Sequence, residues 1–199
     1  MGNINDIELT SLIRSRSGLI ELLADDETEN IRTIAAALAE CLAGGGSVYT
    51  CGNGGSASQA EHFSAELVGR FYKDRPALPV FSLSENGAVL SSLANDYSFD
   101  EVFSHQIDGM GNEGDCLFAL STSGNSENIV RACKKAKEKG LRVFALTGEG
   151  GGRVAPECEL AVMIPDSDTP KIQEMHLVVV HLLCQLVEYA LFAPQDASH

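Results

Sequence analysis

Five short apolar segments alternate with segments of helical periodicity, and this alternation constrains the fold more than any other feature of the chain. The apolar segments are residues 48–50, 80–83, 116–121, 142–147 and 160–164. Strands that alternate with helices form βαβ units, in which helices cover both faces of a parallel sheet. We therefore expect an α/β protein, a three-layer sandwich with a five-stranded parallel sheet.

Residues 5–43 precede the alternating part and have the apolar spacing of two helices. The stretch 25–28 separates the two helices, and the glycines at 44–46 end the second. Helices placed before an α/β core do not complete its sheet, so their apolar stripes need another surface, often a second subunit. We expect residues 1–45 to form a helical arm for oligomerisation and residues 46–199 to form one structural domain.

The charge and the cysteines of the chain disfavour several classes of protein. The formal net charge of −14 disfavours binding to nucleic acid or to an anionic membrane. The six cysteines are scattered without a C-x-x-C pair, which is typical of a reduced protein and not of a disulfide framework or a zinc knuckle. The polar start of the chain predicts no signal peptide, and no apolar run approaches the ~20 residues that span a bilayer. We therefore expect a cytoplasmic protein with neither nucleic-acid nor membrane partners.

A glycine-rich turn joins the first strand to a helix within residues 51–66. The glycines let the backbone bend sharply, Ser56 is a suitable N-cap, and a helix start offers free N–H groups to an anion. His62 and Glu66 share one face of that helix, about one turn after its N-terminus. This pattern predicts a site for a small phosphorylated or hydroxylated ligand. The alternative is an ordinary turn followed by a solvated His–Glu pair.

A second loop, residues 121–126, also follows a strand and precedes a helix. It carries four hydroxyl side chains, those of Ser121, Thr122, Ser123 and Ser126. Hydroxyls, backbone N–H groups and a helix dipole together can bind phosphate without a lysine. The alternative is a hydroxyl-rich turn with an N-cap at Ser126. Because both loops follow strands, they lie at the same edge of the sheet. Neither loop has the pattern of a nucleotide P-loop or of a dinucleotide-binding turn.

The last helix, residues 171–191, places Gln173, His176 and His181 in an apolar sequence. A buried histidine needs a partner, so one of the two histidines is expected to be structural. Gln173 and His181 are eight residues apart, about 12 Å along a helix and roughly 80° around it. They meet at one small site only by reaching toward each other or by coming from different subunits.

Taken together, the motifs resemble those of the phosphoheptose isomerases, enzymes with a flavodoxin-like or Rossmann-like sugar isomerase (SIS) domain. The resemblance covers nearly the whole chain and rests on Cys51-Gly-Asn-Gly-Gly-Ser56, His62-x-x-x-Glu66, Gly69-Arg70, Asn95-Asp96, Ser121 to Ser126, Leu146-Thr-Gly148 and Lys171-Ile-Gln-Glu174 with His181. It implies a homotetramer with active sites at subunit interfaces. The implied reaction converts sedoheptulose 7-phosphate to D-glycero-D-manno-heptose 7-phosphate, the first step toward nucleotide-activated heptose for lipopolysaccharide.

The resemblance also implies roles for individual residues. The substrate, a phosphorylated seven-carbon sugar, is expected to contact Asn53, Gly54, Gly55, Ser56, Arg70, Asn95, Asp96, Ser121, Thr122, Ser123, Ser126 and Gln173. Glu66 and His181 are expected to move the proton between C1 and C2 through an enediol. One zinc ion per subunit is expected at His62, Glu66, Gln173 and His181. Whether Glu66 is a metal ligand or the base stays open, since a tightly ligated carboxylate is a poorer base.

Two positions depart from the family pattern. Gln59 stands where the family usually has Asp, and a neutral amide orients the His62 imidazole less strongly. Ala94 stands where Gly is frequent. Both changes are shared with a non-catalytic SIS-domain regulator that binds a sugar phosphate or the replication initiator protein, which is the alternative function. That relative lacks the Glu and the final His, whereas this chain has Glu66 and His181, which favours catalysis. An isomerase for another phosphorylated ketose is a further alternative.

Overall fold

The computed structural model describes residues 8–193 and confirms the predicted parallel sheet. The five strands are β1 (Val48–Cys51), β2 (Val80–Ser82), β3 (Cys116–Ser121), β4 (Arg142–Thr147) and β5 (Leu160–Met163). All of their pairings are parallel, in the order β2-β1-β3-β4-β5. The chain adds β2 on one side of β1 and adds β3, β4 and β5 on the other side, so the strand order has its switch point between β1 and β3. Ligands bind at such a switch point in open α/β sheets.

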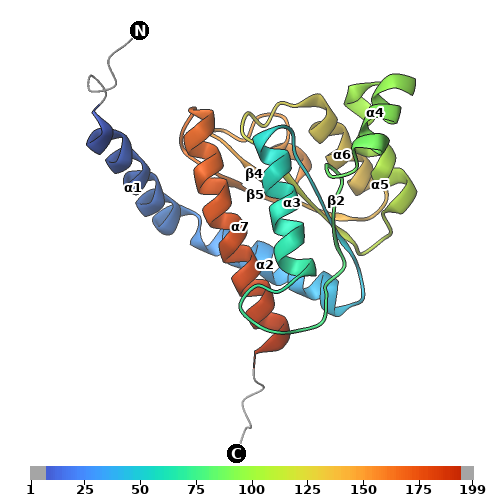
Figure 1. The fold of residues 1–199 in the computed structure, drawn as a ribbon, viewed down its shortest axis with the longest axis horizontal. Helices are drawn as coiled ribbons and strands as arrows, with labels where there is room; N and C mark the ends of the chain where they lie inside the picture. The colour runs from blue at the N-terminus through green and yellow to red at the C-terminus, as the bar shows by residue number, and fades with distance from the viewer. Residues whose placement is uncertain (1–7, 194–199) are drawn as a thin grey trace, which may run out of the picture.

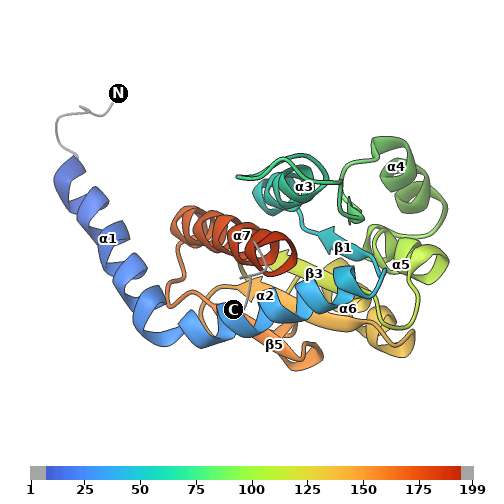
Figure 2. The same ribbon diagram turned by 90° about the horizontal axis from the view of Figure 1, so that it is seen from below.

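Helices cover both faces of the sheet and make three layers (Figure 1 and Figure 2). The first face packs against the end of α1 (Leu9–Asp26) and against α2 (Thr28–Ala43), α3 (Gly55–Val68) and α7 (Thr169–Phe192). The second face packs against α4 (Gly87–Asp96), α5 (Ser104–Met110) and α6 (Glu127–Glu138). Two 3₁₀ turns, η2 (Phe99–Glu101) and η3 (Ala155–Glu157), lie beside the second layer.

The central strand β3 contributes alternate side chains to two separate cores. Phe118 and Leu120 join the core with α2, α3 and α7, whereas Leu117 and Ala119 join the core with α4, α5 and α6. Phe63 of α3 packs on Phe118 with ring centroids 5.0 Å apart. Full burial of such a side chain contributes about 1.5–3 kcal/mol. The helix that follows the glycine-rich turn is therefore fixed to the middle of the sheet.

The two N-terminal helices differ in how they are packed. α2 belongs to the core, with Ile34 and Leu38 fully buried, whereas α1 projects away from the sheet (Figure 1 and Figure 2). Glu27, at the junction of the two helices, accepts a hydrogen bond from the backbone N–H of Met163 on the edge strand β5 (3.2 Å). Apolar side chains on α1 are 43–64% exposed, namely Leu9, Leu12, Ile13, Ile20 and Leu22. A role for this arm in oligomerisation stays a prediction.

α7 is the one helix of residues 8–193 that is long and apolar enough to cross a membrane by length and composition. The expectation that no apolar run reaches this length was therefore wrong. Within the fold α7 is a core helix, and Val179, Val180 and Leu183 are fully buried against the sheet and α2. Its apolar sequence is accounted for by this packing.

The N-terminal boundary of α3 differs from that expected. α3 starts at Gly55 with Gly54 as N-cap, not with Ser56, because the left-handed φ of Gly54 (+56°) completes the turn one residue earlier. Asn95 and Asp96 belong to the last turn of α4. Between Phe99 and Met110 the chain forms η2 and then α5.

Candidate active site

A small polar pocket lies at the carboxyl ends of β1 and β3. Its volume is about 170 Å³, and it is lined by Asn53, Ser56, Leu120, Ser121, Thr122, Ser126, Thr169 and Gln173. The prediction that both loops lie at one edge of the sheet is therefore confirmed. The pocket is smaller than the ~300–1,000 Å³ typical of sites that bury a whole ligand, so it suits one polar end of a ligand, such as a phosphate. Sequence reasoning missed Thr169, which enters the pocket from α7.

A second glycine-rich loop, which follows β4, holds the backbone of the hydroxyl-rich loop. The N–H of Gly148 donates to the carbonyl of Thr122 (3.0 Å), and the N–H of Val154 donates to the carbonyl of Gly124 (2.9 Å). Gly124 has φ +63°, and a Cβ at this position would lie 2.2 Å from the carbonyl oxygen of Gly151. The two loops are in contact through their backbones, so the shape of the pocket depends on both.

Ser126 occupies the N-cap position of α6, but its side chain makes no capping hydrogen bond within the described chain. The hydroxyl lines the pocket instead. The alternative that this loop serves only as a helix cap therefore does not account for Ser126. A free hydroxyl beside the first N–H groups of a helix favours an anion.

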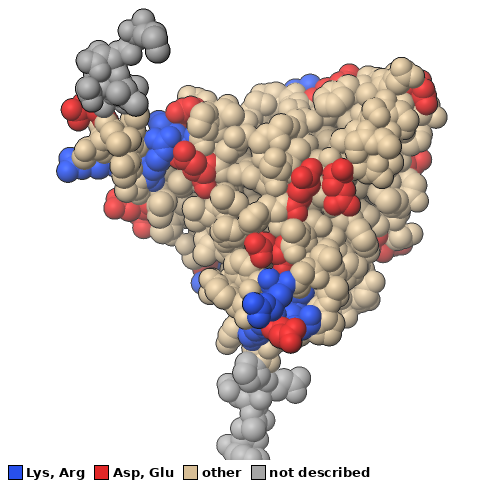
Figure 3. Space-filling view, in the orientation of Figure 1, with Lys and Arg blue, Asp and Glu red and all other residues tan. Residues whose placement is uncertain are grey.

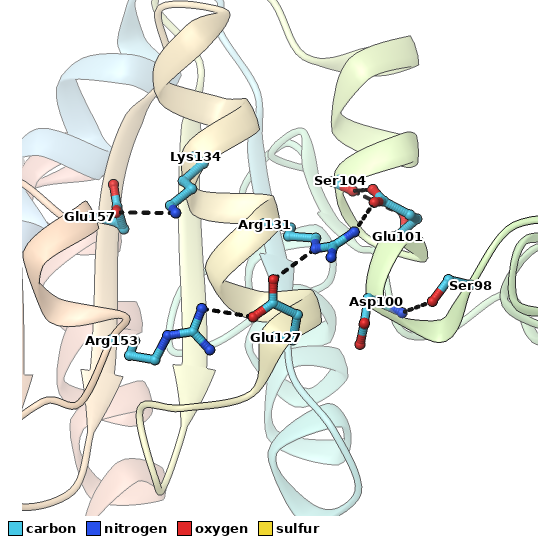
Figure 4. Close-up of polar contacts among 9 residues, drawn as sticks. All are labelled: Ser98, Asp100, Glu101, Ser104, Glu127, Arg131, Lys134, Arg153 and Glu157. Carbon is cyan, nitrogen blue, oxygen red and sulfur yellow. Dashed lines mark hydrogen bonds and ion pairs between the residues drawn. The ribbon is translucent and has the colours of Figure 1, made fainter.

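Charged side chains surround the first turn of α6 (Figure 4). Glu127 is paired with the guanidinium of Arg131 (2.8 Å) and with that of Arg153 (2.8 Å), and Arg131 also pairs with Glu101. Hydrogen bonds from Arg131, and then from Arg153, lower the pKa of Glu127. A carboxylate next to a phosphate site would repel the ligand, and these two cations offset its charge.

Asn53 from the first loop and Asn128 from α6 form a reciprocal pair. Each side-chain amide donates to the carbonyl oxygen of the other at 2.9 Å. Asn128 is buried, so this pair fixes the glycine-rich turn to the helix that follows the hydroxyl-rich loop. No local pattern in the sequence indicated Asn128.

Two histidines and a glutamate converge between α3 and α7. The Nε2 atoms of His62 and His181 are 2.9 Å apart, and His62 Nε2 lies 3.2 Å from Glu66 Oε1. One ligand atom from each of the three residues lies within 4.8 Å of the others. Imidazole nitrogens and a carboxylate oxygen are donors that zinc prefers, so the cluster fits a metal ion. It opens onto a hollow of about 500 Å³, which Glu66 and His181 line together with Phe71 and Tyr72.

Gln173 lies at the polar pocket and not beside His181 on α7. Its amide group packs against Gly55, where a Cβ would lie 2.6 Å from Nε2. The separation that the helical spacing predicted is thus present in the structure. A place for Gln173 among the metal ligands stays a prediction.

Comparison with known proteins decides the family. The SIS domain family model matches residues 13–148. A phosphoheptose isomerase from Pelobacter propionicus is 44% identical over 186 residues, which cover 94% of this chain and 98% of the relative. One from Rhodospirillum rubrum is 50% identical over 161 residues, which cover 81% of this chain and 86% of the relative. The chain belongs to the phosphoheptose isomerase family of SIS-domain proteins.

Solved structures of phosphoheptose isomerases share the fold. The enzyme from Neisseria gonorrhoeae has a TM-score of 0.85 at 33% identity and covers 90% of this chain and 96% of its own. The enzyme from Francisella tularensis has a TM-score of 0.88 at 33% identity, with coverage of 94% and 98%. The resemblance inferred from the motifs is confirmed.

Gln59, which we expected to depart from the family pattern, contacts α7. Its Nε2 donates to the backbone carbonyl of Gln173 (2.5 Å). Its Oε1 is buried and has no protein partner in the described chain. The side chain therefore connects α3 to the pocket end of α7. Its expected effect on the orientation of the His62 ring stays a prediction.

Six residues that the family resemblance assigned to the substrate lie on the surface of the chain, among them Gly54, Gly55 and Ser123 of the two ligand loops. Arg70, which follows α3, is exposed, as are Asn95 and Asp96. The amide of Asn95 donates to the carboxylate of Asp96 (2.9 Å). None of the six lines the polar pocket or the hollow beside the His–Glu cluster. Their roles as substrate contacts stay predictions.

His176 is the structural histidine of the pair on α7. It is fully buried, and its Nε2 lies 3.1 Å from the carbonyl oxygen of Thr147 at the end of β4. A carbonyl can only accept, so Nε2 carries the hydrogen. Burial lowers the pKa of His176 to about 4. The ring is therefore neutral in the folded protein at neutral pH.

We expect His176 to make the folded protein less stable in acid. The pKa of His176 is about 4 when folded and about 6.5 when unfolded, so the unfolded chain binds the proton first as the pH falls. This contribution is fully present above pH ~6.5 and is lost toward pH ~4, by about 2 kcal/mol between pH 7 and pH 5. Urea unfolding of the wild type and of His176→Asn at both pH values measures it. Equal losses in the two proteins would contradict the assignment, since other acidic groups affect both alike.

Proposed function

We propose that the chain is an aldose–ketose isomerase that converts sedoheptulose 7-phosphate to D-glycero-D-manno-heptose 7-phosphate. The observation that carries the proposal is a His–Glu cluster on α3 and α7 together with a polar pocket that both helices also line, through Ser56 of α3 and through Thr169 and Gln173 of α7. The phosphoheptose isomerases that match most of the chain support it. They also favour an enzyme over the regulator alternative.

The spacing along α7 suits a long phosphorylated sugar. Thr169 and Gln173 line the pocket, and His181 lies eight residues beyond Gln173, about 12 Å along the helix. An extended seven-carbon sugar phosphate is roughly 10 Å long, given C–C bonds of about 1.5 Å. With the phosphate held by Ser121, Thr122, Ser123 and Ser126, the C1–C2 end can therefore reach toward the cluster.

We assign proton transfer to Glu66 and His181. The carboxylate of Glu66 takes the proton from C1 of the ketose while His181 donates a proton to the carbonyl oxygen at C2, which gives an enediol. Glu66 then returns its proton to C2, and His181 takes the hydroxyl proton at C1, which gives the aldose. A zinc ion held by His62, Glu66 and His181, with Gln173 as the resemblance implies, would supply polarisation of the carbonyl.

Conversion of sedoheptulose 7-phosphate by the purified protein tests this function. We expect aldose formation that falls when a chelator is added and returns with added zinc. The rate is followed by NMR, with fructose 6-phosphate as the control ketose that lacks the seventh carbon. Tight binding of sedoheptulose 7-phosphate without conversion, in the presence of zinc, would favour the regulator. Equal conversion of both ketoses would favour an isomerase with a broader substrate.

We propose a homotetramer, located in the cytoplasm, whose product enters heptose synthesis for lipopolysaccharide. The exposed apolar side chains of α1 support an assembly, as does an apolar hollow of about 260 Å³ between α2 and α7. Ile31, Leu182 and Leu186 line that hollow. Burial of such surface drives association. Light scattering gives the mass in solution, and a monomer would contradict the tetramer.

A further inference from the structure

The segment that follows α3 contains a buried ion pair with α7. Arg75 Nε lies 3.2 Å from Glu188 Oε1, and the two side chains are only 1% and 2% exposed. α3 and α7 lie side by side in both views, and the segment after α3 runs across the lower part of α7 (Figure 1 and Figure 2). The pair therefore connects the two helices that carry the His–Glu cluster.

Arg75 binds the end of α3 at the turn that contains Glu66. Its Nη1 donates to the carbonyl of Leu67 (2.7 Å), and its Nη2 donates to the carbonyl of Glu66 (3.0 Å). The last carbonyls of a helix have no partner within the helix, and a cation is favoured there. The guanidinium thus fixes the backbone of the residue whose carboxylate belongs to the cluster.

Glu188 of α7 also binds the backbone of the segment that follows α3. Its second oxygen accepts hydrogen bonds from the backbone N–H groups of Tyr72 (2.9 Å) and Lys73 (3.1 Å). Glu188 is seven positions after His181, so the two share one face of α7 about 10 Å apart. Lys73 Nζ also donates to the carbonyl of Phe192 at the end of α7 (2.8 Å). Lysine and arginine side chains gather at the lower end of the molecule in Figure 3, where α7 ends in Figure 1.

Stability alone does not require this pair. Replacing a buried ion pair by packed apolar side chains is often neutral or stabilising. What the guanidinium of Arg75 adds is fixed geometry, since its N–H groups bind the Glu188 carboxylate and two carbonyls of α3 at once. The cluster depends on such geometry, because three side chains from two helices meet within 4.8 Å.

We propose that Arg75 and Glu188 are positioning residues that set α3 relative to α7 and so hold Glu66 and His62 in register with His181. The proposal rests on the proposed function of the cluster as a zinc and proton-transfer site. A displacement of about 1 Å at a reacting group can cost 10²-fold in rate. Loss of a residue that orients metal ligands typically costs 10–100-fold in metal affinity.

Zinc affinity and steady-state kinetics of Arg75→Lys and Glu188→Gln test the proposal. Zinc affinity is measured by competition with a chromophoric chelator, and folding is checked by circular dichroism. We expect both variants to lose at least 10-fold in zinc affinity and in kcat, with KM for sedoheptulose 7-phosphate changed less than threefold, because the phosphate pocket lies at the other end of α7. The control is Arg16→Lys, which alters the exposed pair of Arg16 with Glu174 on α7 (2.6 Å) and should leave both values within twofold.

Variants that fold and keep wild-type zinc affinity and kcat would overturn the proposal. If the single variants do not fold, the double variant Arg75→Met with Glu188→Leu removes both charges. Its zinc affinity and kcat then test the proposal in the same way. Loss of zinc affinity in these variants while the wild type leaves the heptose phosphate unconverted would overturn the proposed function and not the positioning role. A wild type that neither binds zinc nor converts the sugar would overturn both.

Discussion

A Glu66→Gln variant is expected to lose about 10²–10⁴-fold in kcat for isomerisation, the range that a positioned general base contributes. The amide keeps the size of the side chain but cannot accept the proton from carbon. Glu66 lies beside His62 and His181 and outside the lining of the polar pocket. Binding of sedoheptulose 7-phosphate, measured by calorimetry, should therefore change less than about threefold.

Glu61→Gln is the matched control, because Glu61 is an exposed glutamate on the same helix. It should keep wild-type kcat. Zinc affinity separates the two roles of Glu66. Lost turnover with unchanged zinc affinity identifies the base, whereas lost turnover that excess zinc restores identifies a metal ligand. Wild-type turnover in Glu66→Gln would remove both roles.

The features that depend on local spacing along the chain could be predicted from the sequence. The five apolar segments are the five strands, and both ligand loops follow strands at one edge of the sheet. The spacing of His62 and Glu66 on a helix predicted that they share one face, and in the structure His62 Nε2 lies 3.2 Å from Glu66 Oε1. The spacing of eight positions from Gln173 to His181 likewise predicted their separation, because a helix has a fixed rise.

Contacts between distant segments could not be predicted in this way. Arg75 and Glu188 are 113 residues apart, and Asn53 and Asn128 are 75 apart. Nothing in the local pattern around Arg75 distinguishes a buried arginine from an exposed one. The choice of partner follows from how α7 packs on α3, which depends on the whole core. The same holds for Thr169, which reaches the pocket only because of where α7 begins.

Substitution of Gly124 in the hydroxyl-rich loop is expected to weaken binding of the sugar phosphate. We expect Gly124→Ala to raise KM for sedoheptulose 7-phosphate at least 10-fold, with a smaller effect on kcat. The added Cβ would lie 2.2 Å from the backbone oxygen of Gly151, and backbone cannot move aside as a side-chain end can. The loop must shift, and with it the hydroxyls of Ser121 and Thr122 that line the pocket.

Gly150→Ala separates this clash from the cost of a left-handed residue. Gly150 has φ +73° and Gly124 has φ +63°, but a Cβ on Gly150 would have no atom within 4 Å. Both variants carry the left-handed strain of about 1–2 kcal/mol, so both should unfold at lower urea concentrations. Only Gly124→Ala should weaken binding of the sugar phosphate to the folded protein, measured by calorimetry. Equal KM values in the two variants would show that contact between the loops does not shape the phosphate site.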